Sequence, residues 1–179
     1  MADYNDIENL SARTIYKINR IMKLAAIQLF KNVILKTPVD NGRARMNWQY
    51  SSGGFAKGVV ESNDPTGSDA ISKMVDGISR AHVANGLCLT NNLPYIQVLE
   101  YGKYPNPPKK GTYLKEGQKK GQYTGPGFFK FSEGGYSKQA PKGMVRISIQ
   151  EIKKDLSDIL DDVIDNEHGS FTKGTKVFS

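Results

Sequence analysis

The stretch SARTIYKINRIMKLAAIQLFKNVILK, residues 11–36, decides the fold of this 179-residue chain. Pro38 ends the helix that this stretch predicts, because proline has no N–H to donate and disfavours the α conformation in the residue before it. The apolar residues recur at spacings of three and four, the pattern of an amphipathic helix: Ile15, Ile18, Met22, Ala25, Leu29 and Val33.

A second apolar set widens this helix face beyond what one small sheet covers. Two interpretations stay open. Either one stripe faces the core while the other contacts a neighbouring subunit, or both stripes are buried deep within one chain. The second set comprises Ile21, Leu24, Ile27, Phe30 and Ile34.

Length and composition predict one domain with a single core, since 179 residues with 38% hydrophobic content suit one unit better than two. We expect an N-terminal arm over residues 1–10, a domain over 11–165 with a loop insertion at 103–136, and a flexible tail over 166–179. No run approaches the roughly 18 apolar residues of a membrane span, so no membrane partner is expected. Nor does the acidic start of the chain suit a secretory signal. The single cysteine, Cys88, fits a reducing compartment and a small core side chain.

The middle of the chain predicts short elements. Residues 43–50 alternate between polar and apolar, as in a half-buried strand, with Trp48 as a core anchor. Val59 and Val60 predict a weak second strand. Ser68 is a candidate cap for a short helix that extends to about Ala84.

The second half of the chain contains one more core strand, at residues 86–92. Residues 93–102 predict a short helix closed by a glycine cap at Gly102, with a strand as the alternative. Residues 103–143 are dense in proline and glycine and predict a long loop or arm. Residues 143–165 return to helical spacing and predict a second long helix, acidic on its exposed side.

The net charge of +7 is local to residues 103–142, where nine lysines meet only two acids and no arginine. Lysine without arginine favours diffuse attraction to phosphates over base recognition. Aromatic rings lie between these lysines and suit base stacking or the anchoring of a protein interface; a solvated loop is the third possibility. The candidate partner or DNA-channel contacts are Lys109, Lys110, Lys115, Lys119, Lys120, Tyr113, Tyr123, Phe128 and Phe129.

No catalytic or metal motif emerges. The two histidines, His82 and His168, have no ligand at metal-binding spacing, and no phosphate loop, dinucleotide fingerprint or nucleophile elbow is present. We therefore expect no enzyme activity, no metal and no cofactor. For the polar residues near the first turn, we expect Asp40 to hydrogen-bond its own turn and one of the arginines at 43 and 45 to pair with Glu100.

Three segments together resemble the tail-completion, or neck, proteins of long-tailed bacteriophages. They are TPVDNGRAR at 37–45 with Asn47-Trp48, NNLPY at 91–95 with LEYG at 99–102, and SKQAPKGMV at 137–145. The family's usual turn is Pro-Val-Asp-Thr-Gly, and Asn41 departs from it. The gap before Ser137 exceeds the family norm, so the loop at 103–136, which we call the basic arm, is an insertion. The motif residues are Pro38, Asp40, Gly42, Arg43, Trp48, Tyr95, Glu100 and Gly102.

This resemblance implies an α+β domain in which a twisted, mainly antiparallel sheet packs against the N-terminal and C-terminal long helices. It implies a virion structural protein that assembles in the host cytoplasm and forms a ring, expected to be a hexamer, between the head connector or adaptor and the tail tube. The other implied partners are the tail terminator and non-specific DNA in the channel. It implies no enzyme activity and no cofactor. Two alternatives stay open: a tail terminator subunit, or a sequence-independent nucleic-acid-binding protein.

Overall fold

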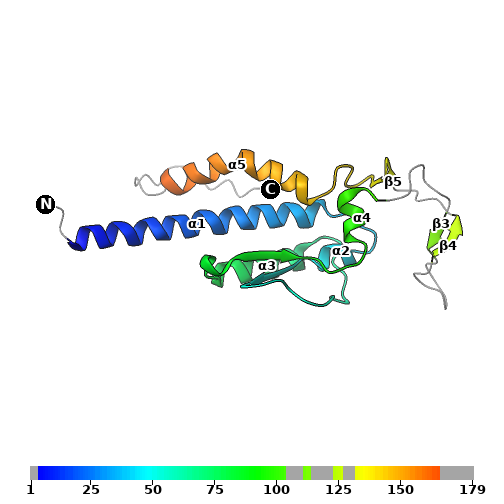
Figure 1. The fold of residues 1–179 in the computed structure, drawn as a ribbon, viewed down its shortest axis with the longest axis horizontal. Coiled ribbons are helices and arrows are strands. Elements are labelled where there is room, and N and C mark those ends of the chain that lie inside the picture. The colour runs from blue at the N-terminus through cyan, green and yellow to red at the C-terminus, as the bar shows by residue number, and fades with distance from the viewer. Residues whose placement is uncertain (1–3, 104–110, 114–122, 127–131, 166–179) are drawn as a thin grey trace.

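A computed structural model describes residues 4–103, 111–113, 123–126 and 132–165. Its longest element is the helix α1 (Tyr4–Lys36), which runs the length of the body (Figure 1). The helix predicted at 11–36 is confirmed, but it begins earlier, so residues 4–10 of the predicted arm are helical. A second long helix, α5 (Val145–Asp165), packs along one side of α1 and confirms the predicted C-terminal helix.

On the other side of α1 lie a helix and a two-stranded sheet (Figure 1). The helix α3 (Ser68–Arg80) ends four residues before the predicted Ala84, and the 3₁₀ turn η1 (Val83–Asn85) follows it. The strands β1 (Gln49–Ser52) and β2 (Leu87–Thr90) pair antiparallel, with Gln49 opposite Thr90. The chain is therefore a mixed helix-and-sheet protein, as the α+β class requires.

The strand predicted at 43–50 is wrong in its first half. Residues Arg43–Met46 form the short helix α2, which begins after Gly42 with a hydrogen bond from Met46 N to Gly42 O of 3.0 Å. Val59 and Val60 form no strand. Instead the buried Asn47 side chain holds this segment, since its Nδ2 donates to Val60 O at 2.9 Å and its Oδ1 accepts from Val60 N at 2.7 Å.

The short helix predicted at 93–102 is confirmed. It is α4 (Ile96–Tyr101), and Gly102 follows it with a φ of 66° in the left-handed region. In the predicted arm, β3 (Gly111–Tyr113) pairs with β4 (Tyr123–Pro126), and β5 (Ser132–Glu133) pairs with β6 (Tyr136–Ser137). The prediction of a loop without regular structure is therefore wrong at these strands.

The core forms where the C-terminal half of α1 meets α3, α4 and the start of α5. Trp48 is buried there, as predicted, and its Nε1 donates to Thr37 Oγ1 at 2.7 Å. Cys88 is only half-buried, so its prediction as a core residue is wrong. Neighbouring residues of a strand point to opposite faces, and Leu87 and Leu89 take the face of β2 that packs on the core.

The N-terminal half of α1 lies outside this core. Ile15, Ile18 and Met22 are 59%, 50% and 48% exposed, whereas Val33 and Ile34 are 3% and 0% exposed. The interpretation that both apolar stripes are buried within one chain is therefore wrong for this half. Among the described helices, none combines the length and the apolar character that a membrane crossing requires.

The core position Met74 provides a test of this packing. Its side chain is fully buried, so Met74→Ala should lower the free energy of unfolding by about 2–5 kcal/mol through lost burial and the cavity that remains. The matched control Phe55→Ala changes a side chain that is 78% exposed and should change that free energy by no more than about 0.5 kcal/mol. Urea-induced unfolding followed by circular dichroism measures both, and equal losses would contradict the assignment of the core.

Candidate interaction surface

The three segments of the sequence motif meet at one end of the molecule, beyond the last turn of α1 (Figure 1). We call this region the motif end and define it as residues 37–48, 91–102 and 136–146. The Gln139 side chain binds the backbone of Val39 twice, with Oε1 accepting from its N–H at 2.7 Å and Nε2 donating to its carbonyl at 2.9 Å. Asn91 Nδ2 donates to Ala44 O at 2.9 Å. Segments far apart in the sequence therefore hold one another.

The turn after α1 is fixed by Arg45, whose guanidinium binds carbonyl groups that the end of the helix leaves without a partner. Its Nη2 donates to Leu35 O at 2.7 Å and its Nε to Thr37 O at 3.0 Å. Gly42 has a φ of 86°, and a Cβ there would lie 2.3 Å from the backbone nitrogen of Pro65, so the position requires glycine.

The predicted partners of this turn are partly wrong. Arg43 Nη2 donates to both carboxylate oxygens of Glu61, at 3.0 and 2.9 Å. The Arg45 guanidinium binds backbone carbonyl groups instead, so neither arginine pairs with Glu100. The bond within the turn comes from Asn41, whose Oδ1 accepts from Arg43 N at 3.0 Å, rather than from the exposed Asp40. Asn41 is thus the residue that closes this turn.

Glu100, at the end of α4, binds the first turn of α5. The residue is 6% exposed, and its Oε2 accepts from the backbone N–H groups of Met144 and Val145 at 2.8 Å each. Its Oε1 accepts from the N–H and the Nε of Arg146 at 3.1 Å each. A carboxylate is stabilising at a helix N-terminus because it satisfies free N–H groups and complements the helix dipole. Sequence reasoning missed Arg146 as the partner.

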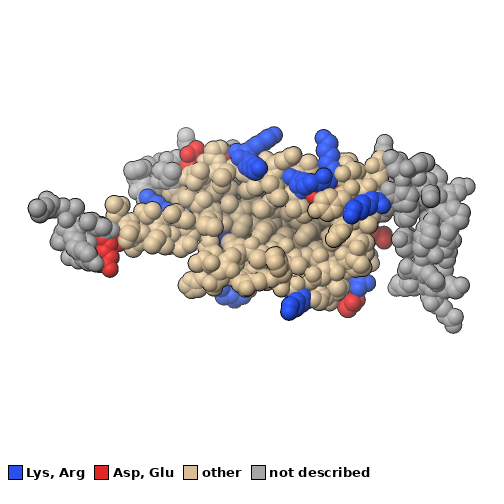
Figure 2. All heavy atoms as spheres, in the orientation of Figure 1, with Lys and Arg blue, Asp and Glu red and all other residues tan. Residues whose placement is uncertain are grey.

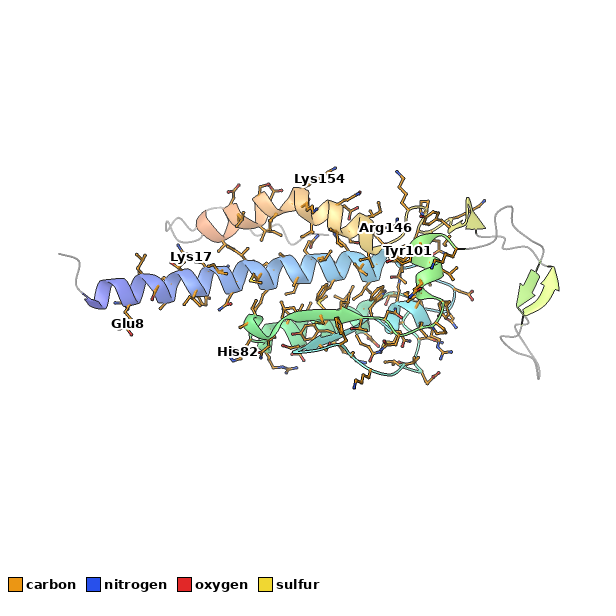
Figure 3. The ribbon with its side chains drawn as sticks, in the orientation of Figure 1. Glu8, Lys17, His82, Tyr101, Arg146 and Lys154 are labelled. Carbon is orange, nitrogen blue, oxygen red and sulfur yellow. The ribbon has the colours of Figure 1, made fainter. Side chains whose placement is uncertain are left out.

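Aromatic and basic side chains cover the outside of this contact. The Arg146 guanidinium lies 5.4 Å from the centre of the Tyr101 ring, and Lys103 Nζ lies 5.6 Å from the same ring (Figure 3). Hydrogen bonds to Tyr136 and Glu100 raise the pKa of Arg146 further above its ordinary value, so it stays charged. Tyr136 also packs on Gly102, where a Cβ would lie 2.4 Å from its ring. This exposed surface can bind a partner through stacking and charge.

Asp64 performs a second capping role beside the turn. It is 4% exposed, and its carboxylate accepts from Gly67 N at 2.8 Å, Ala70 N at 3.1 Å and Thr66 Oγ1 at 2.9 Å. Burial alone raises the pKa of Asp64, but these hydrogen bonds together lower it below its ordinary value. Asp64 rather than the predicted Ser68 therefore caps α3: Ser68 is the first residue of the helix, and the cap position before it is Gly67, a glycine in the left-handed conformation.

Most of the predicted contacts in the basic arm lie outside the described residues: Lys109, Lys110, Lys115, Lys119, Lys120, Phe128 and Phe129. Tyr113 and Tyr123 lie opposite each other in the β3–β4 pair. Over the face that Figure 2 draws, the described Lys and Arg side chains form separate groups with uncharged atoms between them. The contacts proposed for the arm remain predictions.

A second surface is an apolar groove of about 410 Å³ along the middle of α1. Met22, Ala25 and Leu29 of α1 form part of its floor. Ile152 and Leu156 of α5 line one side, and Val83 and Leu87, from η1 and β2, line the other. Apolar grooves of this kind bind apolar side chains of a partner, since they remain in contact with water in the free protein.

Within the described ranges, no group of three or more His, Cys, Asp and Glu residues is placed to hold a metal ion. His82 is exposed and lies between α3 and η1 (Figure 3). His168 lies outside the described residues.

The lowered pKa of Asp64 predicts a pH-dependent stability. Its contribution is fully present above the unfolded-state pKa of about 3.9 and is lost as the pH falls through the lower folded-state pKa. Asp64→Asn should therefore cost about 1–3 kcal/mol of unfolding free energy at pH 7, and the cost should shrink at pH 3. The exposed control Asp40→Asn should stay within about 0.5 kcal/mol. Urea unfolding at both pH values measures this, and a pH-independent cost for Asp64→Asn would refute the role of the charge.

Comparison of the chain with protein-family models, with curated proteins and with solved structures finds no match in any of the three. A functional proposal therefore depends on the motif resemblance and on the geometry of the two surfaces.

Proposed function

We propose that this chain is a structural protein of the neck of a long-tailed bacteriophage, a tail-completion subunit. It forms a ring, expected to be a hexamer, between the head connector and the tail tube around the DNA channel. The observation that carries the proposal is the meeting of the three motif segments at one end of an α+β domain. Segments 91–102 and 136–146 bind each other through Glu100, and both bind the turn after α1.

The chemistry of the buried carboxylates supports a binding role over a catalytic one. A general acid or base needs an oxygen that reaches a substrate. The oxygens of Glu100 and Asp64 accept hydrogen bonds from backbone N–H groups at the starts of α5 and α3. These two carboxylates therefore act in holding the fold.

The exposed surfaces suit protein partners. The motif end presents Tyr101, which is 54% exposed and lies beside Arg146, and Tyr95, which is 40% exposed, and such aromatic and arginine side chains often anchor interfaces. We propose that the motif end contacts an adjacent ring, either the head connector or the tail terminator. The basic arm, which leaves the body at this end, would contact the phosphates of DNA in the channel or a neighbouring subunit.

The strongest competing function is sequence-independent nucleic-acid binding by the free chain. The observation that favours it is the excess of seven positive charges, all within residues 103–142. A protein that binds nucleic acid as a monomer must expose this positive charge to phosphates in the free chain. A ring subunit needs the positive charge only where the assembled ring faces the DNA channel.

Loss of the protein from phage particles tests the proposal directly. In a phage that encodes this chain, a nonsense codon at its gene should yield DNA-filled heads and complete tails that do not join. Electron microscopy of lysates measures the joined fraction, and supply of the wild-type chain from a plasmid should restore it. Normal particles without the protein would refute the proposed function.

A titration with duplex DNA at two salt concentrations separates the two functions. For a neck subunit we expect the isolated chain to bind weakly, with a dissociation constant no tighter than the roughly 10⁻⁴–10⁻⁶ M of non-specific binding at physiological salt. A free nucleic-acid-binding protein would bind more tightly and lose affinity steeply as salt rises. Duplexes of random sequence are the control for base recognition. Tight binding of duplex DNA by the isolated chain that weakens steeply with salt would favour the competing function.

A further inference from the structure

The apolar groove along the middle of α1 keeps large side chains in contact with water. Met22 of its floor and Leu156 of its α5 wall are 48% and 39% exposed. Lys153 is the one charged side chain among the described residues that line it. An occupant of this groove must therefore be apolar.

The groove is large enough for aromatic rings. Its floor contains Ala25 and Ala26, and such small side chains leave space above the helix between the two walls. A cavity of about 150 Å³ holds one benzene ring. At about 410 Å³, the groove therefore has room for two phenylalanine rings.

The helix α5 ends close to this groove. The two long helices run in opposite directions (Figure 1), and Glu151 of α5 accepts a hydrogen bond from Asn32 of α1 at 3.5 Å. From Glu151 to its end at Asp165, α5 advances about 21 Å at 1.5 Å per residue. The same distance along α1 from Asn32 leads to Ile18. The end of α5 therefore lies about one turn of α1 before Met22.

Residues 166–179 follow α5 and contain the side chains that suit the groove, Phe171 and Phe178. An extended chain spans about 3.3 Å per residue, so Phe171 reaches up to about 20 Å from Asp165 and Phe178 up to about 43 Å. Leu156, in the groove wall, lies about 14 Å back along α5 from Asp165. Both phenylalanine rings are therefore within reach of the groove.

We propose that residues 166–179 turn back along α5 and place Phe171 and Phe178 in the apolar groove of the same chain. Gly169 lies between the end of α5 and Phe171, where this path reverses, and glycine accommodates the backbone of a tight reversal. The chain thereby covers its own groove before any partner binds. The inference goes beyond the proposed neck function and does not depend on it.

Attachment to α5 favours this occupant over a second copy of the chain. A segment joined to its site by a few residues has an effective concentration in the millimolar range. The same segment of another copy, at micromolar concentration, competes at a disadvantage of roughly a thousandfold. Burial of two aromatic rings removes apolar surface from water, which stabilises the docked segment.

A disulfide test detects the docked segment. In a Cys88→Ser background, Leu156→Cys and Phe171→Cys are combined and the full chain is oxidised mildly. A disulfide requires its two Cβ atoms to lie within about 4.5 Å of each other, so most of the protein should form an intramolecular bond. The control combines Phe171→Cys with Asp158→Cys, an exposed position about 200° around α5 from Leu156, and should yield about fivefold less.

Intact mass and peptide mapping measure the yield of each disulfide, and unchanged circular dichroism spectra show that the variants are folded. Equal yields for the two cysteine pairs would overturn the proposed docking. A bond between two chains, seen as a dimer on a non-reducing gel, would also overturn it, because another copy would then fill the groove.

Trypsin cleavage provides a second test, in which the described residues stay unchanged. Lys173 and Lys176 lie between the two phenylalanines, so docking should slow cleavage after both lysines. Phe171→Ser combined with Phe178→Ser should speed this cleavage about tenfold, whereas the control Thr175→Ser should leave it as in the wild-type chain. Equal rates in all three proteins would overturn the docking. Failure of either test leaves the neck proposal standing, because the joining of heads and tails tests that proposal.

Discussion

The structure depends on the burial of the C-terminal half of α1. Phe30, Val33 and Ile34 are 9%, 3% and 0% exposed, and full burial of such side chains contributes about 1.5–3 kcal/mol each. The helices α3 and α5 pack on different sides of this segment, and the antiparallel β1–β2 pair packs on α3. A two-stranded sheet is marginally stable by itself. It forms here because α1 and α3 provide the apolar surface that it needs.

Two buried carboxylates then fix how the helices are placed around this core. Glu100, near the end of α4, caps α5 from a segment about 45 residues away, whereas Asp64 caps α3 from the loop just before it. An unsatisfied N–H at a buried helix start costs free energy comparable to a lost hydrogen bond. These bonds therefore set the position of α5 relative to α4, and they explain why Gly143, close against Glu100, has no room for a side chain.

Periodicity predicted the elements whose side chains follow a repeat, and it failed where a single side chain determines the backbone. The spacing in α1 and α5 and the glycine after α4 were sufficient to predict those helices. By contrast, Arg43–Met46 alternate in polarity and yet form a helical turn, because the turn at Gly42 and the Asn47 clamp on Val60 fix the backbone. The pairing of Glu100 with Arg146 spans 46 residues, and no local pattern indicates it. The role of Asp64 was equally hidden, since its hydrogen bonds depend on the left-handed conformation of Gly67.

The distribution of charge bears on how copies of this chain can approach each other. The excess of seven positive charges lies within residues 103–142, so the rest of the chain is formally neutral. Bodies without net charge do not repel one another strongly when they associate. Such bodies can associate without the cost of like charges, and the lysines of residues 103–142 carry the charge that a partner of opposite sign would have to balance.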